Sequence, residues 1–193
     1  MFYIRLLLVS LLITSCSSTN ETNIVSSSGL SPLEQSDSER NEYRKAILLL
    51  NKNQLDTAKD IFLKLKSTRP ELAGPYANLA IIALKQNQPD KALELVKTSL
   101  IRNDKLPQAL NLLAYIEQEN GEIKSAEKHY LEAIKYNQNY ALAHFNIALL
   151  YDIYLQNVDK AIPHYERYMK LINNKDKTTA DWVEQLKRTR ENG

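Results

Sequence analysis

The residue best suited to covalent chemistry in this sequence is Cys16, the only cysteine among 193 residues. A cysteine thiolate is a strong nucleophile, so a lone thiol in a defined setting is a candidate for modification. Because there is no second cysteine, no intramolecular disulfide can form. Cys16 stands in the stretch LLITSCSS, residues 11–18, directly after an apolar run.

The residues before Cys16 have the layout of a secretory signal peptide. Arg5 precedes the apolar run Leu6–Ile13, as in a positively charged segment followed by a hydrophobic one. As a helix rising about 1.5 Å per residue, even Phe2–Ile13 would reach only about 18 Å, against a hydrocarbon core about 30 Å thick. The run is therefore too short to span a bilayer.

The stretch Ile13-Thr14-Ser15-Cys16 resembles the lipobox of bacterial lipoproteins, an aliphatic residue and two small residues before the cysteine. The resemblance implies that residues 1–15 are a lipoprotein signal peptide and that Cys16 becomes the acylated, palmitate-carrying N-terminus. A single acyl chain gives only marginal membrane binding, whereas several chains anchor a protein firmly. By the same resemblance, Ser17 in place of aspartate favours the bacterial outer membrane. Two alternatives stay open: an ordinary leader with an incidental cysteine, and an uncleaved core segment.

Other groups that could support catalysis or bind a metal are scattered. His129, His144 and His164 fall in different expected helices, without an i, i+4 partner histidine or an HExxH motif. The sequence has no GxSxG motif and no glycine-rich phosphate loop. Carboxylate pairs such as Glu117 and Glu119 fit solvated helix faces. We therefore predict no enzyme activity, no metal, no cofactor and no small-molecule substrate.

Composition and charge are those of a globular protein. Hydrophobic residues make up 44% of the sequence and charged residues 25%, and the formal net charge is +2. Without a basic field, nucleic acid is not an expected partner. Residues 16–37, rich in Ser, Thr and Asn, are expected to form a lipidated flexible tether with a reach of about 25 Å. The alternative is that this segment packs on the domain through Ile24, Val25 and Leu30. The rest of the chain is long enough to form one globular unit.

Residue types recur at a period of 34 through the rest of the sequence. The first series runs at intervals of 34, 34 and 34, and consists of Ala46, Ala80, Ala114 and Ala148. A second runs at 34, 34 and 35, and consists of Ala58, Ala92, Ala126 and Ala161. Four residues after each member of the second series comes a larger side chain: Phe62, Val96, Tyr130 and Tyr165. Four copies in register indicate a repeat protein.

These residues resemble the tetratricopeptide repeat (TPR), over about residues 39–173. The resemblance implies an all-α fold, a right-handed α-solenoid of about four helix pairs in residues 38–173 with a C-terminal capping helix within 174–193. Small side chains let helices A and B of a pair approach to about 8–10 Å, and stacked pairs bury faces that one pair cannot. The expected pairs are 38–51 with 54–68, 72–86 with 89–102, 106–119 with 122–136, and 140–155 with 157–172.

The sequence departs from the repeat pattern at several positions. The tyrosine usual in helix A is replaced by Leu49, Ala83 and Glu117 in the first three copies, and only Tyr151 keeps it. One extra residue before Ala161 predicts a longer turn in copy four, and Pro163 predicts a bend in its helix B. Gly121 is expected to adopt a left-handed conformation in the third turn.

The final helix is expected to run from Thr178 to about Arg190. Thr178-Thr179-Ala180-Asp181 resembles a capping box. Trp182, Val183 and Leu186 form an apolar stripe that would cover the exposed end of the fourth pair. A partner-docking role for Trp182 is the alternative.

The TPR resemblance implies a concave groove lined by the A helices, which would hold an extended peptide or a helix of a protein partner. The positions it assigns to this groove mix apolar, aromatic and amide side chains. They are Tyr43, Ile47, Leu50, Asn78, Ile81, Leu84, Asn111, Tyr115, Gln118, Phe145, Asn146 and Leu149. The asparagines would satisfy a bound backbone. The alternative for each apolar position is packing between helices.

An anchor combined with repeats predicts a non-catalytic adaptor or scaffold in the bacterial outer membrane, facing the periplasm. It would capture a peptide or helix of an envelope-assembly partner. The combination resembles pilotins of pilus secretins, lipoproteins that organise peptidoglycan hydrolases, and lipoproteins of TonB-type transport systems, and it does not choose among them. Two other classes stay open: a self-assembling structural component of an envelope complex, and an envelope enzyme of unknown type.

Overall fold

The computed structural model describes residues 37–192, so the predicted signal peptide, Cys16 and the predicted tether up to residue 36 lie outside the described residues. The described part is all-α and contains no strand, which confirms the expected fold class. The helices are α2 (Asp37–Asn51), α3 (Leu55–Thr68), α4 (Ala73–Lys85), α5 (Pro89–Arg102), α6 (Pro107–Glu119), α7 (Ile123–Tyr136), α8 (Ala141–Leu149), η2 (Leu150–Tyr154), α9 (Val158–Leu171) and α10 (Lys177–Asn192).

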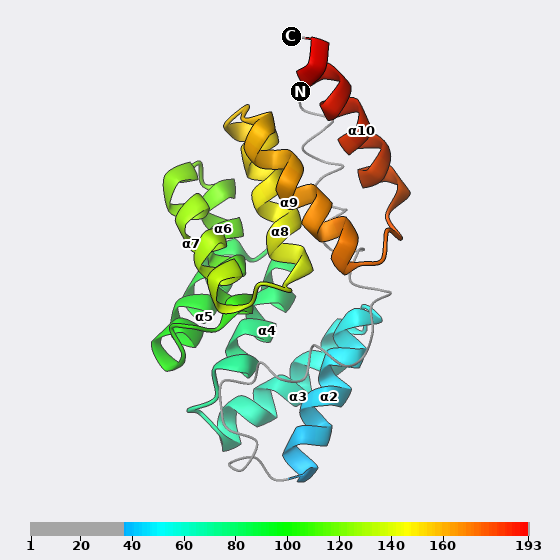
Figure 1. The fold of residues 1–193 in the computed structure, drawn as a ribbon. Helices are drawn as coiled ribbons and strands as arrows, with labels where there is room; N and C mark the ends of the chain where they lie inside the picture. Colours follow the sequence, from blue (N-terminus) through cyan, green and yellow to red (C-terminus); the bar gives the residue numbers. More distant parts are fainter. Residues whose placement is uncertain (1–36, 193) are drawn as a thin grey trace. The chain divides into compact units, whose positions relative to one another are not determined.

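The helices pack as four successive hairpins followed by one further helix (Figure 1). The hairpins are α2 with α3, α4 with α5, α6 with α7, and α8 with α9, and their ends agree with the predicted boundaries to within one residue apart from the end of α8. In this fourth hairpin, helix A continues through η2 to Tyr154. The chain divides into two compact units, residues up to Asn103 and residues from Asp104, where one unit was expected. In repeat proteins the core is divided among stacked repeats, so no single core is required.

The residues that recur at period 34 form the contacts between helices. All eight alanines of the two series have 0% of their surface exposed. The large residues that follow, Phe62, Val96, Tyr130 and Tyr165, are at most 1% exposed. A small side chain on each helix allows close approach, and the larger one fills the space beside it. The repeat pattern therefore encodes the core of both units.

Each hairpin turns through three residues with a left-handed residue in the middle. These residues are Asn53, Asn87, Gly121 and Gln156, with φ between 50° and 82°. In the first turn, the Asn53 N–H donates to the Leu50 carbonyl at 3.0 Å and the Gln54 N–H to that of Leu49 at 2.9 Å. These two bonds close the end of α2 in the manner of a Schellman motif. Gly121 was predicted; the other three were missed because asparagine and glutamine carry a weaker turn signal than glycine.

The longer turn predicted for copy four is wrong. Residues 155–157 connect the helices, as many as in the other turns. The extra residue is absorbed within helix A, where Leu150–Tyr154 form a π-helical turn. The Leu155 N–H there donates to the carbonyl of Leu150 at 3.0 Å, five residues earlier. The wider turn takes up one residue without losing the helix.

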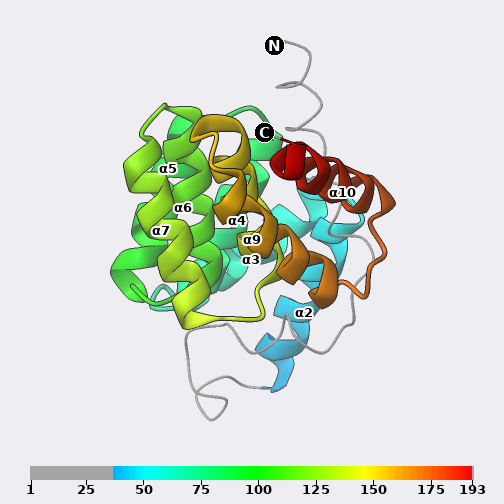
Figure 2. The same ribbon diagram turned by 45° about the horizontal axis from the view of Figure 1, so that its top comes forward.

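The last helix, α10, packs on α9, as Figure 2 also shows. Its predicted start at Thr178 needs correction, because Asp176 caps the helix. The Asp176 carboxylate accepts the Thr179 N–H at 3.0 Å and the Thr179 hydroxyl at 2.7 Å, which satisfies an unpaired donor of the first turn. Val183 and Leu186 of the expected stripe are buried, whereas Trp182 is 43% exposed.

Gly74 makes room for a buried tyrosine from the neighbouring repeat. A Cβ atom at Gly74 would lie 2.5 Å from the hydroxyl oxygen of Tyr43. That hydroxyl accepts a hydrogen bond from Asn78 Nδ2 at 2.8 Å, and burial raises the pKa of Tyr43 to about 12. The glycine is therefore required by the contact between α2 and α4.

We expect Gly74→Ala to lower the free energy of unfolding by about 1–2 kcal/mol, because overpacking outweighs a helix-propensity gain of about 1 kcal/mol. Urea denaturation measures the change. Tyr43→Phe removes the obstructing hydroxyl, so the double variant should be less destabilised than the sum of the two single variants. Strict additivity would show that the Tyr43 hydroxyl is not the obstacle.

Candidate functional site on the A helices

The predicted groove residues divide into a buried set and a partly exposed set. Eight are buried, with at most 8% of their surface exposed: Tyr43, Leu50, Asn78, Asn111, Gln118, Phe145, Asn146 and Leu149. The other four are half-buried: Ile47, Ile81, Leu84 and Tyr115. Ile47, Ile81 and Leu84 belong to α2 and α4 of the first unit, and Tyr115 belongs to α6 of the second. We call α2, α4, α6 and α8 the A helices, and we call the sides of these helices that carry the predicted groove residues the A-helix face. The side chains that remain accessible on this face are apolar or aromatic.

The three asparagines connect successive A helices. In the first unit Asn78 donates to the Tyr43 hydroxyl at 2.8 Å and to the Gly74 carbonyl at 2.9 Å. In the second unit Asn146 Nδ2 donates to Asn111 Oδ1 at 3.1 Å. Both links join residues 35 apart in the sequence, which belong to adjacent repeats. Their buried amides fix the spacing of the A helices on which the half-buried side chains stand.

The other buried groove residues also have partners within their own unit. Gln118 Oε1 accepts a hydrogen bond from the Tyr130 hydroxyl at 3.3 Å. The Phe145 ring lies 6.1 Å from that of Tyr165 and 4.8 Å from that of Tyr168, between ring centroids. These contacts give rigid support to the face rather than free groups at its surface.

Tyr115 offers a hydrogen-bond donor at this face. Burial first, and then the negative charge of Glu119 and the neighbouring Tyr154, raise the pKa of Tyr115 to about 12. The phenol therefore stays protonated at neutral pH. A half-buried tyrosine of this kind combines apolar contact area with one polar group, which suits protein recognition.

Two histidines that sequence reasoning treated as unrelated meet in the fourth hairpin. His144 Nδ1 lies 3.0 Å from His164 Nδ1, and His144 Nε2 lies 3.2 Å from the carbonyl oxygen of Gln138. The carbonyl can only accept, so Nε2 carries the His144 proton, and Nδ1 of His144 accepts from His164. Burial lowers the pKa of both rings, that of His164 to about 4, with the neighbouring His144 adding to the shift. The antiparallel hairpin that brings them together was predictable, but the contact between these two side chains across it was not.

Asp152 joins the end of the fourth helix A to α10. Its Oδ2 atom accepts the Trp182 Nε1–H at 2.7 Å and the Tyr165 hydroxyl at 3.2 Å. Asp152 thereby explains why Trp182 stays partly exposed while Val183 and Leu186 are buried.

Within residues 37–192, no group of three or more His, Cys, Asp or Glu side chains is placed to hold a metal ion. Nor is any helix of that range both long and apolar enough to cross a bilayer.

Since Trp182 is the only tryptophan in the sequence, its fluorescence reports on α10. Asp152→Ala should shift its emission to longer wavelength and destabilise the second unit by about 1 kcal/mol, because the indole N–H loses its charged acceptor. Asp152→Asn keeps an acceptor oxygen and serves as the control with the smaller shift. Identical spectra for Asp152→Ala and the unmodified protein would rule out this contact.

The histidine pair makes stability depend on pH. The folded-state pKa values are lowered, so between about pH 6.5 and 4 the unfolded chain binds protons that the folded chain does not, and stability falls as pH falls. We expect His164→Gln to reduce this decrease in the free energy of unfolding by on the order of 1–2 kcal/mol, after allowance for solvent screening. Thermal unfolding at pH 7 and pH 4.5 measures it. Equal losses in both proteins would contradict the assignment.

Comparison with known proteins agrees with the repeat pattern. Residues 107–140 match the family model of the tetratricopeptide repeat. No curated protein sequence matches the chain significantly.

Among solved structures, PilF of Pseudomonas aeruginosa is similar with a TM-score of 0.68 at 19% identity, over 80% of this chain and 70% of that one. The first TPR domain of Spaghetti (RPAP3), bound to an HSP90 peptide, has a TM-score of 0.55 at 17% identity, over 62% of this chain and 93% of that one. YrrB, a TPR protein with an unusual peptide-binding site, has a TM-score of 0.54 at 20% identity, over 77% of this chain and 76% of that one.

These neighbours share the helical-repeat fold, and the descriptions of two of them mention a bound peptide or a peptide-binding site. Residues 107–140 therefore match the tetratricopeptide repeat in sequence, and the described chain has the fold that proteins built from this repeat share.

Proposed function

We propose that this protein is a non-catalytic adaptor, anchored in the bacterial outer membrane through an acylated Cys16 and facing the periplasm. Its A helices capture a peptide or helix of an envelope-assembly protein. The observation that supports capture most directly is the half-buried apolar set on rigidly linked A helices, Ile47, Ile81 and Leu84 in the first unit with Tyr115 in the second.

Apolar side chains that are held in place but not fully covered bind a partner at low entropic cost. Ile81 and Leu84 stand on α4, whose position is fixed by the Asn78 hydrogen bonds to Tyr43 and Gly74. Such preorganisation favours binding because little conformational freedom is lost on association. The peptide-binding neighbours add support by analogy of fold.

The anchor is supported by the sequence of residues 13–16 and by the apolar run before it. Labelling cells with an alkyne analogue of palmitate should tag the protein, and Cys16→Ser should abolish the tag. The tagged protein should fractionate with the outer membrane. An untagged, freely diffusing protein would contradict the anchoring part of the proposal while leaving the capture part intact.

Capture is tested by a photo-cross-linking amino acid placed at position 81 in intact cells. We expect one discrete envelope protein to be cross-linked, and we expect Leu84→Ser to reduce the yield about tenfold by removing apolar contact area. The matched control carries the cross-linker at Ile101, which is 83% exposed on α5. Equal capture at positions 81 and 101, or unchanged capture in Leu84→Ser with a normal unfolding curve, would reject the A helices as the docking face.

A further inference from the structure

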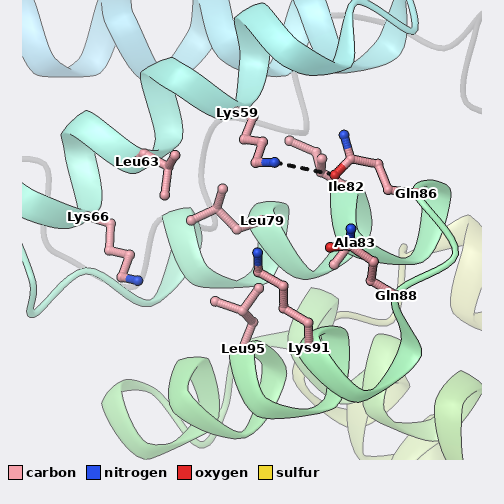
Figure 3. A pocket seen from close by; sticks show the side chains of 10 residues that line it. All are labelled: Lys59, Leu63, Lys66, Leu79, Ile82, Ala83, Gln86, Gln88, Lys91 and Leu95. Atoms are coloured by element: carbon pink, nitrogen blue, oxygen red, sulfur yellow. Dashed lines mark hydrogen bonds between the residues drawn. The ribbon is translucent and has the colours of Figure 1, made fainter.

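A small hollow opens on the first unit between α3, α4 and α5, away from the A-helix face (Figure 3). The α4 residues at its base are Leu79, Ile82 and Ala83, whereas Ile81 and Leu84 belong to the A-helix face. Because successive helical residues are rotated by about 100°, the two sets point to different sides of α4. The hollow is therefore a separate surface from the one proposed above.

The hollow exists because a tyrosine is missing from the second repeat. Ala83 occupies the position that Tyr151 holds two repeats later. In the second unit, Tyr151 is buried, its hydroxyl donates to Glu127 at 2.8 Å, and its ring lies 4.9 Å from Lys160 Nζ and 5.9 Å from the His164 ring. Those three residues stand at the repeat positions of Lys59, Lys91 and Leu95, which line the hollow. Tyr151 thus fills in one unit the space that Ala83 leaves open in the other.

The base and wall of the hollow are apolar. Leu79 and Ile82 are buried beneath it, and Leu63 and Leu95 flank it from α3 and α5. Its volume is about 50 Å³, about a third of the roughly 150 Å³ cavity known to admit benzene. It has room for one aliphatic side chain and is too small for a lipid chain or an aromatic cofactor.

The rim of the hollow is positively charged. Lys59, Lys66 and Lys91 stand around it, and no acidic side chain lines it. Lys59 donates to the neutral Gln86 amide at 3.4 Å, and Lys66 Nζ lies 5.5 Å from the Tyr76 ring centroid. Among the described residues, none of the three lysines forms an ion pair with a carboxylate. Their charges are available to an anionic partner.

We propose that this hollow binds an acidic peptide segment that carries one aliphatic side chain. The aliphatic group rests on Leu79 and Ile82, and carboxylates on either side pair with Lys59, Lys66 and Lys91. The apolar contact supplies affinity and the lysine rim supplies specificity and faster association. The adaptor thereby has a second docking surface, distinct in chemistry from the apolar A-helix face.

The test measures fluorescence anisotropy with the full chain in non-ionic detergent. The probe is a labelled heptapeptide with leucine at the centre and three glutamates on each side; control peptides carry serine at the centre, or lysines in place of the glutamates. We expect saturable binding of the probe, at least about tenfold weaker binding of each control, and weakening by added salt.

Two variants connect binding to the hollow. Ala83→Tyr should fill it as Tyr151 does in the second unit, lowering affinity at least about tenfold with an unchanged or higher melting temperature. Lys91→Glu should lower affinity by a similar factor, whereas Lys97→Glu, an equal charge change on α5 outside the hollow, should have a much smaller effect.

Three results would overturn the proposal. The first is equal binding of the leucine and serine probes, which would mean attraction by charge alone. The second is full affinity in Ala83→Tyr. The third is binding to phosphatidylglycerol vesicles without binding to the probe, which would identify a membrane surface instead. None of these results depends on cross-linking at position 81, so failure here is distinguishable from failure of A-helix capture.

Discussion

Close approach of two helices at a pair of small side chains is the contact on which the rest of this structure depends. Ala46 and Ala58 in the first hairpin, and their counterparts in the other three, have no exposed surface. With helix axes about 8–10 Å apart, a larger residue at either position would separate the helices and open the core. The side chain one turn later, such as Phe62 or Tyr165, then packs into the remaining space. Each hairpin is thereby a rigid block that presents its other residues to solvent or to its neighbours.

Because the interior positions are fixed by the repeat, differences between copies appear at the remaining positions. Ala83 and Tyr151 occupy the same repeat position. Ala83 leaves a hollow in the first unit, whereas the Tyr151 ring fills the equivalent space in the second. In a similar way, helix A of the fourth copy accommodates an extra residue as a π-helical turn, and Asp152 in that turn bonds to Trp182 of α10. Small departures from the consensus thus create the surfaces that distinguish this protein from a uniform array.

The proposed adaptor uses two faces of the same helix. Ile81 and Leu84 point from α4 to the A-helix side, and Leu79, Ile82 and Ala83 form the base of the hollow. The hydrogen bonds of Asn78 to Tyr43 and Gly74 hold α4 against α2. Since one face is apolar and the other has a lysine rim, they suit segments of different chemistry, and an acidic segment would not compete for the A-helix face.

The sequence by itself determined the all-α repeat fold, the positions of the helices and their buried alanines, because a period of 34 residues repeats the same local packing problem four times. It also placed the apolar and aromatic candidates on the A helices. Only the tertiary structure decided which of them are accessible: Asn78, Asn111 and Asn146 bond within the protein, while Ile47, Ile81, Leu84 and Tyr115 remain half-buried. The His144–His164 pair, the hollow beside Ala83 and the π-helical turn were equally beyond the sequence. The histidine pair and the hollow depend on side chains that meet from different helices, and the π-helical turn depends on where one helix takes up an extra residue; local periodicity specifies neither.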